Sequence, residues 1–407
     1  MPTTRKGVNT FSVWSMGTHE ELLNRWSLEN SNENHLKRWW WEIDPYLFWT
    51  MILLLCIGLI MVFSASMTTS IMSYSDPYYF FKKQVVGVAL SFFFFIIASF
   101  IRLDFVRKMS SKLLLLSVVL LTLVFFPYIG RMVGGSYRWI DFGIMRFQPS
   151  ELAKLSLIIY MADTLVTHRH RAQDFWYGVV PFLLVVGVMG VLVIMEPDLG
   201  TAIFLAGITF VMLFLGGRKI IHLLYPIFAG IPILLFLIFA SGNQYWKARL
   251  EAFVNPWKEP LGKGFQIIQS LIAIGSGGLF GRGLGESRQK FFYLPDRHTD
   301  FIFAIIGEEL GFIGTIGVVI LFCILFWRGW LIAVRSGDDF QAMLAMGIIL
   351  SILMQVIVNM SAVLKILPVS GVPLPLVSYG NSSILITMIE IGLLFNIARQ
   401  SKVNHFE

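Results

Sequence analysis

One acidic residue stands where a carboxylate can act as a base. Asp300 follows His298 and Thr299 and directly precedes a long apolar run that begins at Phe301. A carboxylate at such a boundary is half desolvated, which makes it a better proton acceptor. The same position suits a helix cap, because Thr299 or Asp300 could accept hydrogen bonds from the first helical turn. The residue types alone leave both roles open.

A second group of charges lies at the start of another apolar run. Glu151 and Lys154 are three residues apart, so they share one face of a helix. Charges at membrane depth are costly and normally face a bundle interior or a water-filled cavity. Together with the preceding Arg138 and Arg146, Lys154 would suit a phosphorylated lipid headgroup. A structural ion pair flanked by interfacial arginines explains the same residues.

The other carboxylates in apolar surroundings favour structural roles. Glu308 and Glu309 are adjacent, so they point about 100° apart on a helix and at most one can share a cavity with Asp300. Glu390, in the last apolar run, needs a buried partner for the same reason. Asp198 lies in a tight turn and is placed to cap the helix that follows.

Membrane-spanning helices must position these residues. Hydrophobic residues make up 56% of the 407-residue chain and charged residues only 14%, whereas soluble chains carry about 25% charged residues. Because lipid offers no water to unpaired backbone groups, apolar runs of ~20 residues must be helices. The sequence predicts an all-α polytopic membrane protein with about ten transmembrane helices. The predicted spans are residues 46–66, 84–101, 113–130, 150–167, 178–195, 201–217, 220–240, 301–327, 341–363 and 382–398.

The predicted chain organisation has three parts: a polar N-terminal tail (1–44), a helical domain (45–400) and a short C-terminal tail (401–407). The distribution of Lys and Arg places both termini in the cytoplasm. Between the seventh and eighth helices we predict a large extracytoplasmic loop, residues 241–300, whose aromatic residues argue for order. The irregular stretch 368–380 predicts a cavity wall, because such backbone is tolerated at membrane depth only inside protein or beside a cavity.

Composition excludes several other functions. The net charge of +7 fits loops that face anionic lipid, and without phosphate-binding Gly-rich loops or basic–aromatic patches it does not indicate nucleic acid. Cys56 and Cys323 both lie in apolar runs, so neither a disulfide nor a metal framework is expected. His298 has no metal-ligand companions at useful spacing, which argues against a zinc site.

Several motifs in order resemble one known family. They are Arg138-Trp139-Ile140-Asp141, residues 148–154, Pro197-Asp198-Leu199-Gly200, Asn255-Pro256-Trp257, residues 298–303, Gly307-Glu308-Glu309 and residues 368–383. Over about residues 45–400 the chain resembles the SEDS family (shape, elongation, division and sporulation) and is most similar to its division members. Two positions depart from the family pattern: Lys365 stands where Gly, Thr or Arg is usual, and Asn381 replaces a glycine.

The resemblance implies a peptidoglycan glycosyltransferase of the bacterial cytoplasmic membrane that polymerises lipid II into glycan strands at the division septum. It implies an inverting transfer with undecaprenyl pyrophosphate as leaving group and Asp300 as the catalytic base. The predicted substrate-binding residues are Arg138, Arg146, Glu151, Lys154, His298, Ser378 and Ser382. No resident metal is predicted, and Mg²⁺ or Mn²⁺ is a candidate cofactor.

The implied partners are an FtsI-like class B penicillin-binding protein that acts as the septal transpeptidase, other divisome membrane proteins, and membrane lipid. Two alternatives remain open from the sequence. One is a lipid II flippase, since buried charges and a cavity fit transport as well. The other is the elongation branch of the same family.

Overall fold

The computed structural model describes residues 44–403 apart from 127, 134–135, 142, 144–145, 240–243, 291–293 and 296. The chain divides into two units, Met1–Asp44 and Pro45–Glu407, and the helices, sheet and cavities lie in the second unit. The predicted N-terminal tail and most of the predicted C-terminal tail lie outside the described residues, so both assignments stay predictions.

Each predicted span overlaps one helix of the described chain. These helices are α2 (Pro45–Tyr74), α3 (Tyr79–Phe100), α5 (Ser110–Leu123), α6 (Pro149–Thr167), α8 (Val180–Met195), α9 (Leu199–Leu215), α10 (Ile220–Phe239), α13 (Ile302–Arg335), α14 (Asp339–Val363) and α15 (Asn381–Val403). In the described part, α2, α3, α13, α14 and α15 are long and apolar enough to cross a membrane. The predicted all-α polytopic class is confirmed, whereas the number of crossings stays a prediction.

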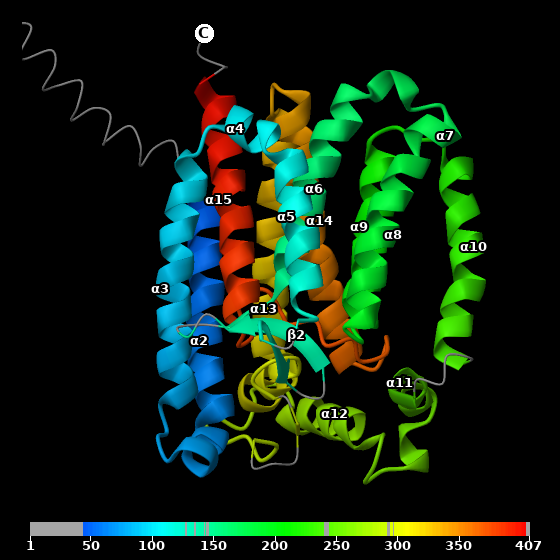
Figure 1. The fold of residues 1–407 in the computed structure, drawn as a ribbon. Helices are drawn as coiled ribbons and strands as arrows, with labels where there is room; N and C mark the ends of the chain where they lie inside the picture. Colours follow the sequence, from blue (N-terminus) through cyan, green and yellow to red (C-terminus); the bar gives the residue numbers. More distant parts are fainter. Residues whose placement is uncertain are drawn as a thin grey trace, which may run out of the picture. The chain divides into compact units, whose positions relative to one another are not determined.

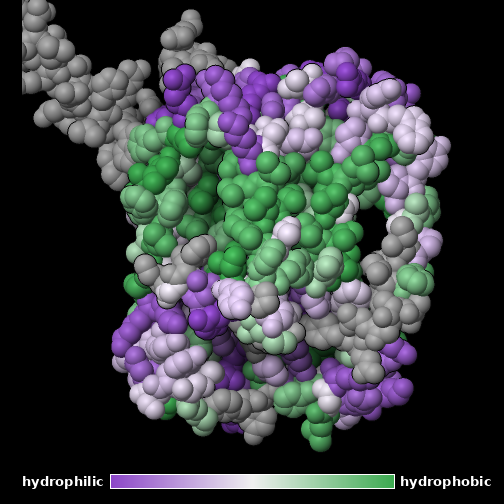
Figure 2. Space-filling model, viewed as in Figure 1, coloured by the Kyte–Doolittle hydropathy of each residue, from purple (hydrophilic) through white to green (hydrophobic). Residues whose placement is uncertain are grey.

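The long helices run side by side and alternate in direction (Figure 1). The short helices α4 (Leu103–Lys108) and α7 (Phe175–Gly178) lie at one end of this bundle, which we call the α7 end. A small sheet, α11 (Gln244–Val254) and α12 (Phe265–Gly277) lie at the opposite end, which we call the sheet end. On the face shown in Figure 2, hydrophobic residues form a band between two hydrophilic ends, as a bilayer requires.

The core of the bundle lies around α6, α14 and α15. In the most apolar window of α15, 89% of the residues are buried, compared with 28% in α3 and 22% in α13. The core also holds polar side chains, with Glu151 and Lys154 on α6, Gln355 on α14 and Glu390 on α15 all buried. Ionisable groups at this depth need partners inside the protein.

The third predicted span differs from the structure, because α5 ends at Leu123 rather than near residue 130. The chain then forms a three-stranded antiparallel sheet of β1 (Gly130–Val133), β2 (Ser136–Asp141) and β3 (Arg146–Phe147). Ile140 pairs with Phe147 and Asp141 with Arg146. Apolar residues such as Val124, Phe125, Phe126 and Ile129 continue the run between α5 and β1, so hydropathy alone extends the helix to the start of the sheet.

Helix α13 is broken near its start, which the sequence did not predict. Gly311 has φ 66° and ψ −162°, a left-handed conformation that glycine adopts without steric cost. The loop that follows α12 fills the break: the Arg282 amide donates to the Glu308 carbonyl at 3.0 Å, and the Phe312 amide donates to the Gly278 carbonyl at 2.9 Å. The break therefore leaves these backbone groups paired.

Candidate active site

Asp300 lies at the sheet end, immediately before α13. The helix begins at Ile302 with Phe301 as its N-cap residue, so the cap position falls one residue after Asp300. The main-chain carbonyl of Asp300 accepts a hydrogen bond from Nδ2 of Asn359 at 2.8 Å. A Cβ built on Gly371 would lie 3.7 Å from Oδ2 of Asp300, so the carboxylate faces the loop that contains Gly371.

A cavity of about 280 Å³ lies beside this segment, and we call it the cationic cavity. Lys83 and Arg146 supply its positive charges, and the Arg146 side chain is 52% exposed and 3.9 Å from Asp141. The remaining walls are largely aromatic, with Thr299 contributing from the Asp300 segment. The lining residues are Tyr74, Tyr79, Phe80, Lys83, Trp139, Asp141, Gly143, Arg146, Thr299, Tyr379, Gly380 and Asn381.

A second cavity of about 350 Å³, which we call the apolar cavity, lies between α9, α11, α14 and residues 367–370. Phe204, Trp246 and Val358 contribute to its walls. Arg249 also lines it and donates to the Val369 carbonyl at 2.9 Å. Ser370 lines this cavity and directly precedes Gly371, which adjoins the Asp300 carboxylate. Asp300 itself lines neither cavity, but Thr299 beside it lines the cationic cavity, and its carboxylate faces Gly371, which follows Ser370 of the apolar cavity.

The His298 side chain packs against two aromatic rings. Its ring lies 4.8 Å from the Phe80 ring and 5.5 Å from the Tyr379 ring, measured between centroids. Burial, with a smaller effect of Arg297, lowers the pKa of His298 to about 4. The imidazole is therefore neutral at pH 7 and does not supply a cation for phosphate.

The guanidinium of Arg138 binds the turn between α8 and α9. Its Nε donates to the Glu196 carbonyl at 2.8 Å, and its Nη2 donates to the Pro197 carbonyl at 2.5 Å. Its Nη1 lies 3.6 Å from the Asp198 carboxylate. Asp198 in turn caps α9 by accepting from the Thr201 amide at 3.1 Å, which confirms its predicted capping role. Arg138 thus ties the sheet to this turn.

Glu151 and Lys154 form a buried ion pair. Lys154 Nζ lies 2.8 Å from Glu151 and donates to Gln355 at 3.2 Å. Their side chains are 8% and 4% exposed, and neither lines the cationic or the apolar cavity. Lys154 also lies 5.2 Å from the centre of the Phe204 ring, which separates it from the apolar cavity that Phe204 lines.

Ser378 and Ser382 both hold backbone segments of the site. The Ser378 hydroxyl donates to the Thr299 carbonyl at 2.6 Å and accepts from the Leu374 amide at 2.8 Å. The Ser382 hydroxyl donates to the Arg146 carbonyl at 3.0 Å. Both serines are buried, and their role as substrate ligands stays a prediction.

Glu308 and Glu309 fasten the loop that leads to Asp300. Glu308 accepts from the Ser287 hydroxyl and from the Arg288 amide at 3.0 Å. Glu309 accepts from the Ser64 hydroxyl at 2.7 Å and lies 3.8 Å from Lys290. Both carboxylates therefore have structural partners, as the sequence predicted.

Three residues of the site were missed by sequence reasoning. Lys83 lines the cationic cavity, Asn359 holds the Asp300 backbone, and Glu196 is a buried acid in the α8–α9 turn. Burial and, to a lesser extent, Asp198 raise the pKa of Glu196 to about 9, although Arg138 opposes the shift. A lysine at a helix start and an asparagine in an apolar run carry no spacing signal that could have marked them.

Among the described residues, no three His, Cys, Asp or Glu side chains group closely enough to hold a metal ion. A Mg²⁺ or Mn²⁺ ion at this site would therefore take most of its ligands from phosphate oxygens and water, which is usual for Mg²⁺.

The fold and the site together define a polytopic membrane protein with a carboxylate whose neighbouring residues line a cationic and an apolar cavity. The family model of cell cycle proteins of the FtsW, RodA and SpoVE type matches residues 45–403, and the chain belongs to this family.

The chain is 41% identical to "Stage V sporulation protein E" of Bacillus subtilis over 86% of this chain and 95% of that protein. It is 39% identical to "Probable peptidoglycan glycosyltransferase FtsW" of Trichlorobacter lovleyi, over 89% and 94% of the two chains. The protein of that name from Geobacter sp. (strain M18) is 37% identical over 88% and 97%.

Solved structures give the same assignment. A chain from a peptidoglycan synthase complex that coordinates polymerization and crosslinking matches with a TM-score of 0.74 and 29% identity, over 88% of this chain and 98% of that one. The rod shape determining protein RodA of Thermus thermophilus matches with a TM-score of 0.65 and 27% identity, over 88% and 97%.

Proposed function

We propose that this protein is a peptidoglycan glycosyltransferase that polymerises lipid II into glycan strands. The observation that carries the proposal is the position of Asp300: its neighbour Thr299 lines a cavity with two cations, and its carboxylate faces Gly371, which follows a residue of a cavity with apolar walls. A lipid-linked sugar pyrophosphate needs both surroundings. The relatives named as glycosyltransferases match over most of the chain, which supports the same reaction.

Asp300 acts as the general base in this reaction. It takes the proton of the GlcNAc 4-hydroxyl of lipid II, and the oxygen attacks the anomeric carbon of the growing strand. The bond to undecaprenyl pyrophosphate breaks and the electron pair leaves with the pyrophosphate, which needs no acid. A single displacement on an α-linked donor yields a β-linked product, so the transfer inverts the configuration at the anomeric carbon.

The cationic cavity holds the pyrophosphate. Lys83 and Arg146 provide two positive charges for the anion that forms as the bond breaks, which lowers the barrier to its departure. Tyr79, Trp139 and Tyr379 offer aromatic faces to the sugars. A divalent ion, where present, would neutralise part of the pyrophosphate charge beside Asp141.

The apolar cavity receives prenyl chain. Its walls are formed by side chains such as Ile203, Phe204 and Leu250, and Arg249 is also among its lining residues. Apolar walls of this kind suit isoprene units of the prenyl chain.

The division machinery is the proposed setting. Named FtsW and sporulation relatives are 37–41% identical to the chain, whereas the RodA structure is 27% identical, which favours the division and sporulation branches over elongation. We extend the proposal to a septal location, to cytoplasmic termini, and to a crosslinking partner of the class B penicillin-binding protein type. The synthase complex that couples polymerization to crosslinking supports the partner.

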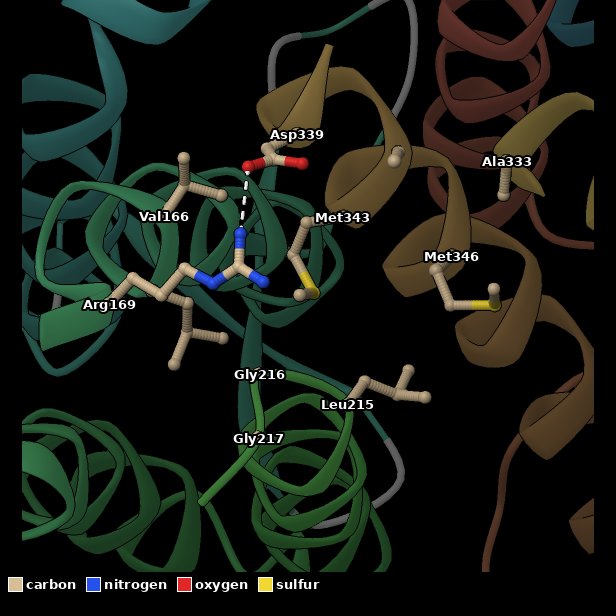
Figure 3. A pocket seen from close by; sticks show the side chains of 11 residues that line it. Val166, Arg169, Leu215, Gly216, Gly217, Ala333, Asp339, Met343 and Met346 are labelled. Carbon is tan, nitrogen blue, oxygen red and sulfur yellow. Dashed lines mark hydrogen bonds and ion pairs between the residues drawn. The ribbon is translucent and has the colours of Figure 1, made fainter. Parts of the chain in front are cut away.

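The alternative of a lipid II flippase requires a path through the bundle. A pocket of about 310 Å³ does open at the α7 end, between α6, α9, α13 and α14 (Figure 3). Arg169 and Asp339 approach to 3.3 Å at this pocket. Between it and the sheet end, α6, α9 and α14 are in close contact, since a Cβ on Gly347 would lie 2.7 Å from Ile158 and 2.9 Å from Met212. This packing favours the enzyme.

A paired assay tests the proposal. Purified protein with its cognate transpeptidase and lipid II should yield glycan strands on a gel, and Asp300→Ala should abolish them while the variant still binds the transpeptidase. Lipid II scrambling in liposomes, if present, should be the same for both proteins. Strand synthesis by Asp300→Ala together with lost scrambling would favour transport instead.

A further inference from the structure

We propose that Asn359 is the positioning residue for the catalytic carboxylate, an inference that rests on the proposed function. Asn359 lies near the end of α14 and is 2% exposed. Its Nδ2 donates to the carbonyl of Asp300 at 2.8 Å and to the carbonyl of Val372 at 2.8 Å. One side chain thus joins the two segments that flank the carboxylate.

The chemistry of the site calls for this residue type. The carbonyl oxygens of Asp300 and Val372 take two donated protons, and an amide nitrogen carries two on a single atom. A hydroxyl carries one proton and an ionised carboxylate carries none, so Ser, Thr or Asp cannot replace Asn here. The two acceptors also fix the orientation of the amide, because turning Oδ1 toward them would place three oxygens together.

The bond to Val372 matters because of the neighbouring residue. Gly371 has φ 76° and lies beside Oδ2 of Asp300, where its Cα–H face forms one wall of the carboxylate's surroundings. Asn359 therefore sets the position of Asp300 and of that wall together. Without it, the segment before α13 and the loop 371–372 lose this direct link at Asp300, although Ser378 still joins Thr299 to Leu374.

The chain contains a matched control on α15. Asn396 is also fully buried, and its Nδ2 donates to the carbonyls of Ala98 at 3.0 Å and Ile101 at 2.6 Å. This second pair of hydrogen bonds joins α15 to the end of α3 at the α7 end, whereas Asp300 lies at the sheet end (Figure 1). Asn359→Leu and Asn396→Leu thus remove the same pair of bonds from two places, one at the active site and one remote from it.

We would compare the two variants in the complex with the transpeptidase, measuring strand synthesis, thermal stability and amide hydrogen exchange. Both should lose similar thermal stability. Asn359→Leu should lower kcat about 10- to 100-fold, because small misplacement of a catalytic group has effects of this size, with KM for lipid II within about threefold. Faster exchange should appear in residues 298–303 and 371–378. Asn396→Leu should keep kcat within about threefold and show faster exchange near Ile101.

Asn359→Gln guards against a Leu variant that does not fold, since it keeps the amide donor but lengthens the side chain. The Gln variant should fold, and its kcat should lie between those of the wild type and Asn359→Leu. If Asn359→Leu does not fold, the kcat of the Gln variant should still be lower than that of the wild type. Equal kcat losses in Asn359→Leu and Asn396→Leu, or wild-type kcat in Asn359→Gln, would overturn the positioning role. An active Asp300→Ala would instead contradict the proposed function, so the two failures are distinguishable.

Discussion

The guanidinium of Arg138 lies 3.6 Å from the carboxylate of Asp198 and binds the two carbonyls that precede it. This contact joins the sheet that carries Arg146 to the turn that starts α9. The side chain that the sequence predicts as a phosphate ligand therefore binds groups of the protein itself. The cations of the cavity beside the Asp300 segment are Arg146 and Lys83.

Arg138→Lys should destabilise the protein without weakening substrate binding. Lysine cannot make both carbonyl bonds in the geometry of the guanidinium, and hydrogen bonds from charged groups are worth about 1.5–3 kcal/mol. Thermal unfolding and the KM for lipid II measure the two effects. Arg146→Ala is the control. Because the Arg146 side chain is half exposed and lines the cationic cavity, its removal should raise the KM for lipid II and leave the stability unchanged. A raised KM with normal stability in Arg138→Lys would restore the phosphate role.

Lys154→Ala should damage folding, because it leaves Glu151 buried without its partner. Breaking a buried pair typically costs about 3–5 kcal/mol. The double variant Glu151→Gln with Lys154→Met removes both charges at similar volume, so it should recover most of the stability and activity. A stable double variant that polymerises no lipid II would show that the pair acts on substrate.

Glu196→Gln should flatten the dependence of stability on pH. The folded-state pKa of Glu196 is about 9 and its unfolded reference is 4.5, so the folded protein holds a proton that the unfolded chain has lost. Its contribution is full below pH 4.5 and falls by up to about 1.4 kcal/mol per pH unit as pH rises toward 9. Unfolding midpoints of both proteins from pH 5 to 8 test this, and parallel curves would refute it.

Lys365→Gly should stabilise the protein. Lys365 has φ 58°, a left-handed conformation that costs a side chain with a Cβ about 1–2 kcal/mol. Glycine removes that cost and loses part of the gain through the freer unfolded chain, so a net gain of about 1 kcal/mol is expected. A lower unfolding midpoint for the variant would contradict the interpretation. Asn381, the other position that departs from the family pattern, is the first residue of α15, and its φ lies outside the left-handed region.

Local sequence signals predict much of this molecule. Apolar runs locate the long helices, and i,i+3 spacing is enough to pair Glu151 with Lys154. The boundary between a polar segment and an apolar helix marks Asp300. Each of these signals lies within a few residues of sequence, where helix geometry relates spacing to direction.

Contacts between distant segments account for what the sequence did not predict. Ser382 meets the Arg146 carbonyl across 236 positions, and Asn359 meets Asp300 across 59. The break at Gly311 depends on a loop near Gly278 that supplies its backbone partners. No local pattern encodes such pairings, so the sequence does not reveal that Ser378, Ser382 and Asn359 hold backbone segments of the site.

The most direct test of the account is the rate of strand synthesis by Asp300→Asn. The amide has nearly the size of the carboxylate, so the variant should keep its unfolding midpoint and still bind the transpeptidase. It cannot accept the proton of the hydroxyl. Polymerisation of lipid II under single-turnover conditions should be about 10²–10⁴-fold slower than the wild type. A rate within threefold of the wild type would show that Asp300 is not the base.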